Sequence, residues 1–380
     1  MKRIYFDNAA TTPLDPEVKA LMRETMDVFG NPSSIHHEGR QAKTIIEKAR
    51  KSISGMLGVS PGEIIFTSSG TEADNMAIRC SIEDLGVQRI ISSKIEHHAV
   101  LHTLDYFGDK GIEIVYVDLL QNGHIDMAHL EKLLGTGDKK TLVSLMHANN
   151  EIGNLLDIEA VGNLCESYSA VFHCDTVQTI GHLPIDIQKS KIHFLTASGH
   201  KFNGPKGIGF IYISENVKVK PMIHGGAQER NMRGGTENIY GIAGIAKALE
   251  IAYAEMEAQQ KRISELKDYA AGLILANFEG VRFNGDSNGQ SLYTILNIAF
   301  PSSLLSDMLL FSLDIEGVSA SGGSACTSGS DQGSHVLREL RVAEDYNSVR
   351  FSFGKYNTRD EVDAVITILK GICEPQKVAH

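Results

Sequence analysis

Hydrophobic and polar positions alternate along the first 250 residues in a pattern that predicts strands and helices in turn. Short apolar runs rich in branched side chains predict strands, and they cover residues 63–69, 89–95, 112–117, 141–147, 170–175, 193–197 and 208–213. Most gaps between these runs have room for a helix. The pattern therefore predicts an α/β fold with a largely parallel sheet that helices cover on both faces. The last two runs are joined without a helix, so they can pair antiparallel.

Helical spacing of apolar residues marks three further segments. The sequence Asp15–Pro16–Glu17 is typical of a helix start, and Gly30 is the expected stop of that helix. Apolar positions in 42–57 recur every three or four residues, which predicts an amphipathic helix that ends at Gly58. Residues 242–276 predict one long helix or two consecutive ones, and we expect a domain boundary inside this segment.

Composition narrows the class of protein. The chain has 380 residues, 42% of them hydrophobic and 22% charged, which is ordinary for a globular protein of two domains, or of one large domain with a satellite. The formal net charge of -11 argues against nucleic acid or an anionic membrane as the main partner. The apolar runs are too short for a signal peptide or a membrane span. Five cysteines without a C-x-x-C pair fit a reducing cytosol, so the sequence predicts a cytoplasmic protein.

Candidate chemistry gathers where strands are expected to end. Lys201 lies in a turn-rich segment after a strand run, at an edge where open α/β sheets bind ligands. A partly desolvated lysine there can condense with an aldehyde such as pyridoxal phosphate (PLP), although a lone lysine is more often a solvated surface residue. Asp175 ends another run and could keep a pyridinium nitrogen protonated, or only cap a helix. Gly70 and Thr71 open a helix whose first N–H groups suit a phosphate, or are only part of an ordinary helix start. Together the residues predict a PLP site.

Cys326 differs from the other cysteines in its surroundings. Glycine and serine supply 11 of the 18 residues from 317 to 334, which predicts a mobile loop and an accessible thiolate. Cys80, Cys165 and Cys174 lie within helix or strand patterns and are expected to pack in the core. Among the 15 histidines, adjacent pairs such as those at 36–37 and 97–98 point in different directions on regular structure, so we expect no metal cage.

These residues stand in motifs that resemble the cysteine desulfurases of the NifS/IscS type, which are class V aminotransferases and fold-type I PLP enzymes. The motifs run through nearly the whole chain: DNAATT at 7–12, GNPSS at 30–34, TEADN at 71–75, EH at 96–97, NNEIG at 149–153, the segment around Lys201, RGGT at 233–236, GSAC at 323–326 and VRFS at 349–352. The resemblance implies a large PLP-binding domain, residues 13–257, with a mostly parallel sheet flanked by helices. Residues 1–12 and 258–380 would form a smaller α+β domain that carries the cysteine loop.

The resemblance also implies roles for single residues. Lys201 would hold PLP covalently, Asp175 would pair with the pyridine nitrogen, and His97 would stack on the ring and assist proton transfer. Gln178 and Asn150 resemble groups that bind the ring oxygen of the cofactor and steady the bound substrate. The phosphate would be bound by Gly70, Thr71, Ser198 and His200, and the phosphate of the partner subunit would be bound by Thr236.

A site completed across an interface implies a homodimer. Arg350 resembles the guanidinium that clamps the substrate carboxylate, a bidentate task for which lysine is a poor substitute.

The implied reaction converts L-cysteine to L-alanine and leaves the sulfur on Cys326 as a persulfide. An acceptor such as an iron–sulfur scaffold protein would then receive it, and Cys326 could become a transient ligand of an iron–sulfur cluster. Two alternatives stay open: a selenocysteine lyase or another PLP-dependent lyase of sulfur amino acids, and a catalytically idle PLP-fold protein that serves as a binding partner.

Overall fold

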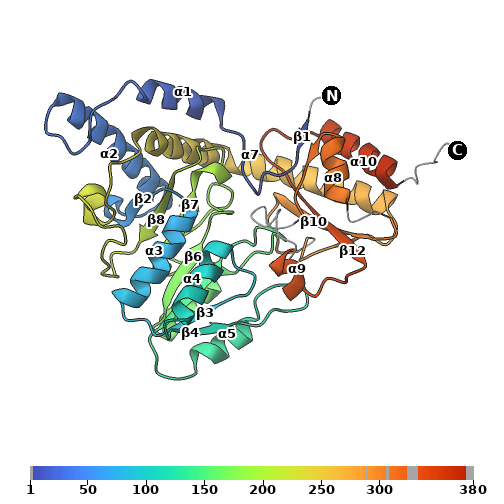
Figure 1. Ribbon diagram of the computed structural model, residues 1–380, viewed down its shortest axis with the longest axis horizontal. Coiled ribbons are helices and arrows are strands. Elements are labelled where there is room, and N and C mark those ends of the chain that lie inside the picture. Colours follow the sequence, from blue (N-terminus) through green and yellow to red (C-terminus); the bar gives the residue numbers. More distant parts are fainter. Residues whose placement is uncertain (1–2, 288, 305–307, 323–332, 374–380) are drawn as a thin grey trace.

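The computed structural model describes residues 3–287, 289–304, 308–322 and 333–373. Its largest layer is a seven-stranded sheet in the order β2-β8-β7-β6-β5-β3-β4 (Figure 1). The strands are β2 (Ile64–Thr67), β3 (Arg89–Ser92), β4 (Glu113–Tyr116), β5 (Thr141–Met146), β6 (Val171–Asp175), β7 (Phe194–Ser198) and β8 (Gly209–Ile213). Only β8 runs against its neighbours, so the sheet is mostly parallel as predicted, and the antiparallel pairing of the last two runs is confirmed.

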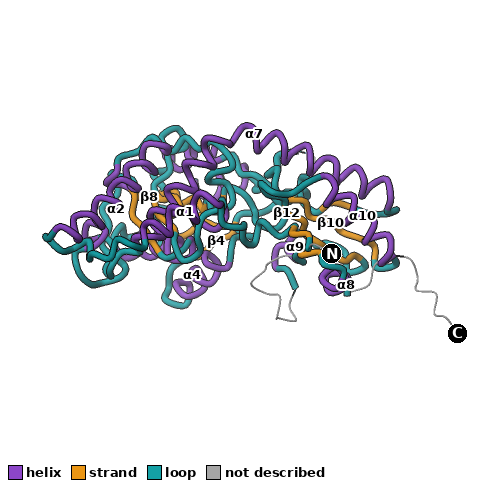
Figure 2. The backbone as a smooth tube through the Cα atoms, turned by 90° about the horizontal axis from the view of Figure 1, so that it is seen from above, coloured by secondary structure: helices purple, strands orange, loops and turns teal. Residues whose placement is uncertain are grey.

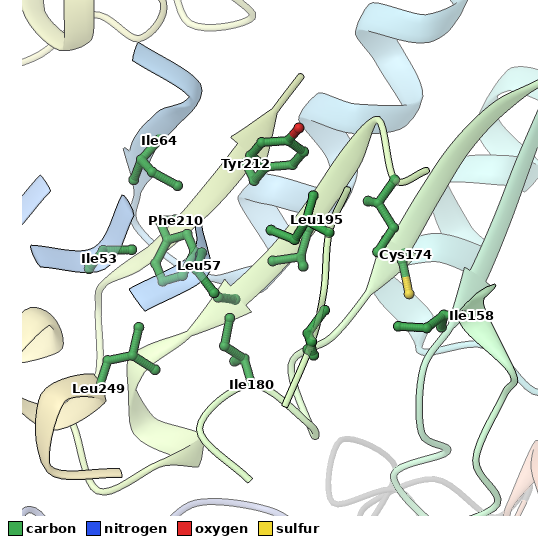
Figure 3. Close-up of a cluster of buried hydrophobic side chains, with 14 of the residues drawn as sticks. Ile53, Leu57, Ile64, Ile158, Cys174, Ile180, Leu195, Phe210, Tyr212 and Leu249 are labelled. Carbon is green, nitrogen blue, oxygen red and sulfur yellow. The ribbon is translucent and has the colours of Figure 1, made fainter. Parts of the chain in front are cut away.

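Helices cover both faces of this sheet. The helices of this part are α1 (Pro16–Thr25), α2 (His37–Leu57), α3 (Gly70–Glu83), α4 (His98–Gly108), α5 (Met127–Leu134), α6 (Ile158–Ser167) and α7 (Ile239–Asn277), with short 3₁₀ turns η1 (Pro61–Glu63), η2 (Gly199–Lys201) and η3 (Gln228–Asn231). On one face α2, α6 and α7 pack on strand residues such as Leu195, Phe210 and Tyr212 (Figure 3). On the other, α3 and α4 pack on Ile65 and Ile211. Successive strand residues thus enter opposite cores, because side chains alternate along a strand.

The ends of the first two helices confirm some of the local predictions and contradict one. Asp15 caps α1 as predicted, since its carboxylate accepts a hydrogen bond from the backbone N–H of Glu17. The helix nevertheless ends at Thr25, five residues before the expected stop at Gly30. A Cβ on Gly30 would lie 2.2 Å from the carbonyl carbon of Glu38, so this glycine permits close packing on α2. Helix α2 ends as predicted before Gly58.

A second group of strands lies beside the large sheet. Strands β9 (Arg282–Phe283), β10 (Ile295–Pro301) and β12 (Tyr346–Ser352) form an antiparallel sheet, and β1 (Ile4–Tyr5) pairs in parallel with β11 (Val318–Ser319). Helices α8 (Leu309–Ile315), α9 (His335–Glu339) and α10 (Arg359–Cys373) belong to this part of the chain. A separate hydrophobic core fills it.

Helix α7 joins the two groups of strands. It is one continuous helix of 39 residues, and Figure 2 shows it running along both parts of the molecule. Leu249 packs in the core of the large sheet, whereas Ile263 and Ile274 pack in the core of the second group. The long-helix alternative of the sequence analysis is therefore confirmed, while the domain bounds near residue 257 stay a prediction. None of the helices in the described ranges combines the length and apolar character that crossing a bilayer requires.

A buried ion pair ties helix α2 to turn η3. The two terminal nitrogens of Arg50 each lie 2.9 Å from a carboxylate oxygen of Glu229, and both side chains are almost fully buried. Glu229 also accepts a hydrogen bond from the backbone N–H of Phe66. Glu229 and Arg230 have φ angles of 43° and 57°, a left-handed conformation that costs energy in residues other than glycine. The contacts of Glu229 with Arg50 and Phe66 help to hold the turn in this conformation.

We expect Glu229→Ala to lower the free energy of unfolding by about 3–5 kcal/mol, because it leaves a buried guanidinium without its partner. Glu47 offers a matched control, since it also contacts Arg50, at 3.3 Å, but its side chain is 42% exposed. Glu47→Ala should therefore cost no more than about 1 kcal/mol. Chemical unfolding of the three proteins measures the difference. Similar losses for both variants would contradict the assignment.

Candidate active site

The carboxyl ends of β6 and β7 and the start of α3 meet around a cavity of about 230 Å³. Parallel strands bring their carboxyl ends to one edge of the sheet, where ligands bind in this class of fold. The predicted site residues that line the cavity are Gly70, Thr71, His97, Asn150, Asp175, Gln178, Ser198, His200, Lys201 and Arg350. Residues more than 270 positions apart in the chain therefore line the same cavity.

Lys201 ends the η2 turn directly after β7. Its Nζ donates hydrogen bonds to the carbonyl oxygens of Ala9 and Ala10, at 2.5 and 3.1 Å. Gln178 donates to the same Ala9 oxygen at 3.0 Å. The turn itself requires Gly204, where a Cβ would lie 2.7 Å from the carbonyl oxygen of Gly199. The amine is thus delivered to the cavity by a tight backbone turn.

Two buried aspartates lie at the floor of the cavity. Asp175 ends β6, and its Oδ1 accepts a hydrogen bond from the backbone N–H of Val177. Burial and the neighbouring Asp74 raise the pKa of Asp175 to about 7. Burial raises the pKa of Asp74 to about 8, and its Oδ1 lies 3.3 Å from Nε2 of His173. Asp74 was not predicted from the sequence, although it lies four residues after Gly70 and so on the same face of α3.

The contribution of these two carboxyls to the stability of the cofactor-free protein is expected to fall as the pH rises from about 4 through about 8. The unfolded chain ionises both carboxyls near pH 4, whereas the folded chain holds the pKa of Asp175 at about 7 and that of Asp74 at about 8. At these two groups the folded state binds more protons within this window, so their contribution to the free energy of unfolding falls with rising pH. Buried histidines with lowered pKa values, such as His97 and His200, contribute in the opposite direction. Asp74→Asn removes one of the two titrations, so its melting temperature should rise relative to that of the wild type between about pH 5 and pH 8. Parallel pH profiles for the two proteins would count against this explanation.

His97 forms the N-cap of α4. Its Nδ1 accepts a hydrogen bond from the backbone N–H of Ala99 at 3.1 Å, so a neutral ring carries its proton on Nε2. Burial, followed by the charge of Lys201, lowers the pKa of His97 to about 4. The ring therefore stays neutral at physiological pH and presents one N–H group.

The expectation that adjacent histidines point in different directions does not extend to one group of histidines. His98 and His102 lie four residues apart on α4 and therefore share one face of the helix, unlike the adjacent pairs. Their ring centroids are 4.9 Å apart, and the ring of His335 lies 4.6 Å from that of His98. Within the described ranges, no three or more His, Cys, Asp or Glu side chains are arranged to hold a metal ion.

The start of α3 offers backbone donors beside the cavity. Ser69 is its N-cap, and the N–H groups of the first turn have no partner within the helix. Gly70 is required there, because a Cβ would lie 2.7 Å from Cγ2 of Val177. Burial and the charge of Lys201 lower the pKa of His200 to about 4, so its neutral ring adds a hydrogen-bonding group.

Thr236 lies apart from this cavity. It lines a smaller one of about 80 Å³ together with Thr67, Ser68 and Arg233. The guanidinium of Arg233 pairs with both carboxylate oxygens of Glu72, at 2.9 and 3.1 Å. The segment that carries Thr236 is therefore fastened to the helix start that carries Thr71.

Arg350 presents a guanidinium from the buried strand β12. Its Nη1 donates to the carbonyl oxygen of Asn150 at 2.7 Å, and its Nη2 to the carboxylate of Asp7 at 2.8 Å. Its Nε is buried and has no hydrogen-bond partner among the described residues. A buried N–H without a partner is costly, so this edge of the guanidinium is suited to an anionic ligand. Asp7 was not singled out from the sequence.

Arg350→Lys is expected to lower kcat/KM for L-cysteine, the substrate that the motif resemblance implies, by about tenfold to a hundredfold. A lysine cannot reproduce the planar fork that holds Asn150 and Asp7 while facing the cavity. Steady-state kinetics on the loaded enzyme measures the effect, which should appear mainly in KM. Arg338→Lys is the matched control, because Arg338 is exposed on α9 and does not line the cavity. Unchanged kinetics for Arg350→Lys would refute the assignment.

Cys326 lies outside the described residues. The chain on either side of 323–332 is nevertheless fixed near the cavity: Ser321 exchanges backbone hydrogen bonds with Arg350, and the hydroxyl of Ser334 donates to the carboxylate of Glu151. Three other cysteines, Cys80, Cys165 and Cys174, are buried as expected. Burial raises the pKa of all three thiols, which suppresses thiolate chemistry there.

Comparison with known proteins agrees with this geometry. Residues 4–365 match the family model for class-V aminotransferases. The chain is 42% identical to a cysteine desulfurase IscS of Dictyoglomus turgidum, over 98% of this chain and 95% of the relative. It is 41% identical to a cysteine desulfurase IscS of Methanosarcina thermophila, over 98% and 92% of the two chains. The chain belongs to the cysteine desulfurase family of class-V aminotransferases. Cysteine desulfurases are generally PLP-dependent.

Solved structures of similar proteins share the fold. One, described as a NifS-like protein, superposes with a TM-score of 0.89 at 36% identity and covers 98% of both chains. Another, described as SspA in complex with cysteine, gives a TM-score of 0.81 at 31% identity over 93% of this chain and 100% of that one. The resemblance read from the motifs and the fold-type I architecture are therefore confirmed.

Proposed function

We propose that this chain uses PLP to convert L-cysteine to L-alanine and passes the sulfur to Cys326. The observation that carries the proposal is the convergence of an amine, a buried carboxylate, a helix N-terminus and an unpaired buried guanidinium N–H on one cavity. Each of these groups matches one functional part of a phosphorylated pyridine aldehyde or of an amino-acid substrate.

The residues present fit PLP. Lys201 would hold it covalently, and Asp175 would pair with the ring nitrogen, which returns the raised pKa of this carboxyl toward its ordinary range by charge pairing. Gln178 and the neutral rings of His97 and His200 supply hydrogen-bonding or stacking groups around the cofactor. The phosphate would lie at the start of α3, with Gly70, Thr71, Ser198 and His200 around it. When bound, PLP withdraws electrons from the α-carbon of the substrate.

The protein residues supply positioning and proton transfer. Arg350 would bind the substrate carboxylate through its Nε edge, while Asn150 and Asp7 keep the guanidinium from rotating. Once the substrate amine has displaced it, the Lys201 amine would be free to transfer protons to and from the substrate. His97 is neutral and carries its proton on Nε2, so it can exchange a proton within the cavity.

Cys326 would act as the nucleophile toward sulfur. Its thiolate attacks the substrate sulfur, the new S–S bond forms, and the bond between sulfur and the β-carbon breaks. The electron pair of the broken bond stays with carbon, which takes up a proton, so L-cysteine and a thiol yield L-alanine and a persulfide. The backbone pairing of Ser321 with Arg350 supports this role, because it begins the Cys326 segment beside the substrate-binding arginine.

Delivery to an iron–sulfur scaffold protein, action as a homodimer and a place in the cytoplasm belong to the same proposal. The names of the IscS relatives favour sulfur delivery. The position of Thr236 outside the Lys201 cavity favours a residue that serves the partner subunit. In a complex with the acceptor, Cys326 would be available as a transient ligand of an iron–sulfur cluster.

The test is the alanine released from L-cysteine by the PLP-loaded protein with a thiol reductant present. L-selenocysteine, assayed in parallel, distinguishes the selenocysteine lyase alternative. The proposal is supported if alanine forms from L-cysteine at a rate comparable to, or higher than, the rate from L-selenocysteine. Alanine from L-selenocysteine alone would transfer the assignment to that alternative, and no product from either would favour the idle binding partner.

A further inference from the structure

His182 links the peptide of Lys201 to a tyrosine of the second strand group. Its Nε2 lies 3.1 Å from the carbonyl oxygen of Lys201, and its Nδ1 lies 3.2 Å from the hydroxyl of Tyr293. His182 follows β6 in the chain, and Tyr293 lies two residues before the start of β10. Neither side chain lines the cavity that holds the Lys201 amine. Both line a separate cavity of about 40 Å³ behind the turn, which Phe202 and Asn203 also line.

Chemistry fixes which ring nitrogen carries the proton. A carbonyl oxygen only accepts, so Nε2 of His182 must be the donor to Lys201. In the neutral ring Nδ1 is then an acceptor, which suits the hydroxyl of Tyr293. Burial lowers the pKa of His182 and raises the pKa of Tyr293, so the first stays neutral and the second keeps its proton. The same hydroxyl also lies 3.4 Å from the carbonyl oxygen of His182.

The turn that carries Lys201 is held on two sides. Thr12 binds it from the N-terminal segment, where its backbone N–H and its hydroxyl each donate to the carbonyl oxygen of His200 at 2.9 Å. His182 holds the next carbonyl along the chain. Because a lysine side chain has several rotatable bonds, the place its amine reaches depends on how firmly its own backbone is fixed.

We infer that His182 is a positioning residue for Lys201: its Nε2–H fixes the Lys201 peptide, and Tyr293 fixes the imidazole ring. The contact between the segment that follows β6 and the segment that precedes β10 would thereby set the direction in which the amine enters the cavity. The inference rests on the proposed function only in so far as it assumes that Lys201 attaches PLP.

Two substitutions of His182 test its two ring nitrogens separately. His182→Gln places an amide donor near the position of Nε2, whereas His182→Asn places one near Nδ1 and leaves the Lys201 carbonyl without that donor. We expect His182→Asn to slow covalent attachment of PLP to the apoprotein by about fivefold to tenfold at saturating PLP. His182→Gln should stay within about twofold of the wild type, and Tyr293→Phe should fall between the two. Equal rates for His182→Asn and His182→Gln would overturn the inference.

A second measurement does not depend on PLP. Nitrogen NMR of the cofactor-free protein, labelled in its histidines and assigned with His182→Gln, should show His182 as the neutral tautomer with its proton on Nε2. A proton on Nδ1, or a charged ring near pH 7.5, would overturn the inference. Wild-type protein that never attaches PLP would refute the proposed function, while the tautomer would still decide the role of His182. Melting temperatures of the apoproteins identify a variant that attaches PLP slowly because it is misfolded. If a His182 variant is misfolded, the attachment rate of Tyr293→Phe decides the test instead.

Discussion

Lys201→Ala is expected to abolish turnover of L-cysteine, lowering kcat by at least about a thousandfold. The variant removes both the attachment point of PLP and an amine that moves protons in the cavity, where Lys201 lies against the carbonyl oxygens of Ala9 and Ala10. Two measurements check it: alanine formation, and PLP that stays with the polypeptide after borohydride reduction and denaturation.

Lys206→Ala is the matched control, because Lys206 is exposed five residues along the same segment and does not line the cavity. It should keep both the activity and the reducible attachment. If Lys201→Ala still yielded PLP bound to the polypeptide after reduction, another lysine would be the anchor and the proposed site would be wrong.

Cys326→Ala is expected to separate substrate binding from sulfur transfer. Arg350, Asn150 and Lys201 are untouched, so L-cysteine should still change the absorbance of the bound cofactor. Alanine formation should fall by at least about a thousandfold, because no thiolate is left to take the sulfur. Cys373→Ala is the control, since Cys373 is the one described free cysteine that is not buried.

The absorbance change and the alanine yield must both be measured, since only their divergence supports the assignment. Sulfide released at the wild-type rate by Cys326→Ala would assign sulfur transfer to another group.

Sequence patterns predicted the parts of the fold whose signals are local. The apolar runs became the strands of the large sheet, because consecutive residues such as Ile64, Ile65 and Phe66 are buried on alternating faces. The Asp15 cap was predictable because its partner is two residues away. The end of α1 was not, since Gly30 serves packing against Glu38 and not helix termination.

The site was predictable to the extent that its residues stand in recognisable motifs or at strand ends. Asp74 and Asp7 went unnoticed because each acts through a neighbour distant in the chain, Asp175 in the first case and Arg350 in the second. The link from His182 to Tyr293 joins residues 111 positions apart. No local pattern encodes such a contact, since it exists only when the two strand groups pack together.

The backbone pairing of Ser321 with Arg350 has a consequence for the delivery of sulfur. Cys326 follows Ser321 by five residues, and a fully extended chain spans at most about 3.6 Å per residue, so the Cα atom of Cys326 stays within about 18 Å of that point while the pairing holds, and the thiol within one side-chain length more. An acceptor must therefore bring its own thiol inside this radius. Different acceptors would have to occupy the same small volume in turn, so their relative concentrations and affinities would divide the sulfur among them.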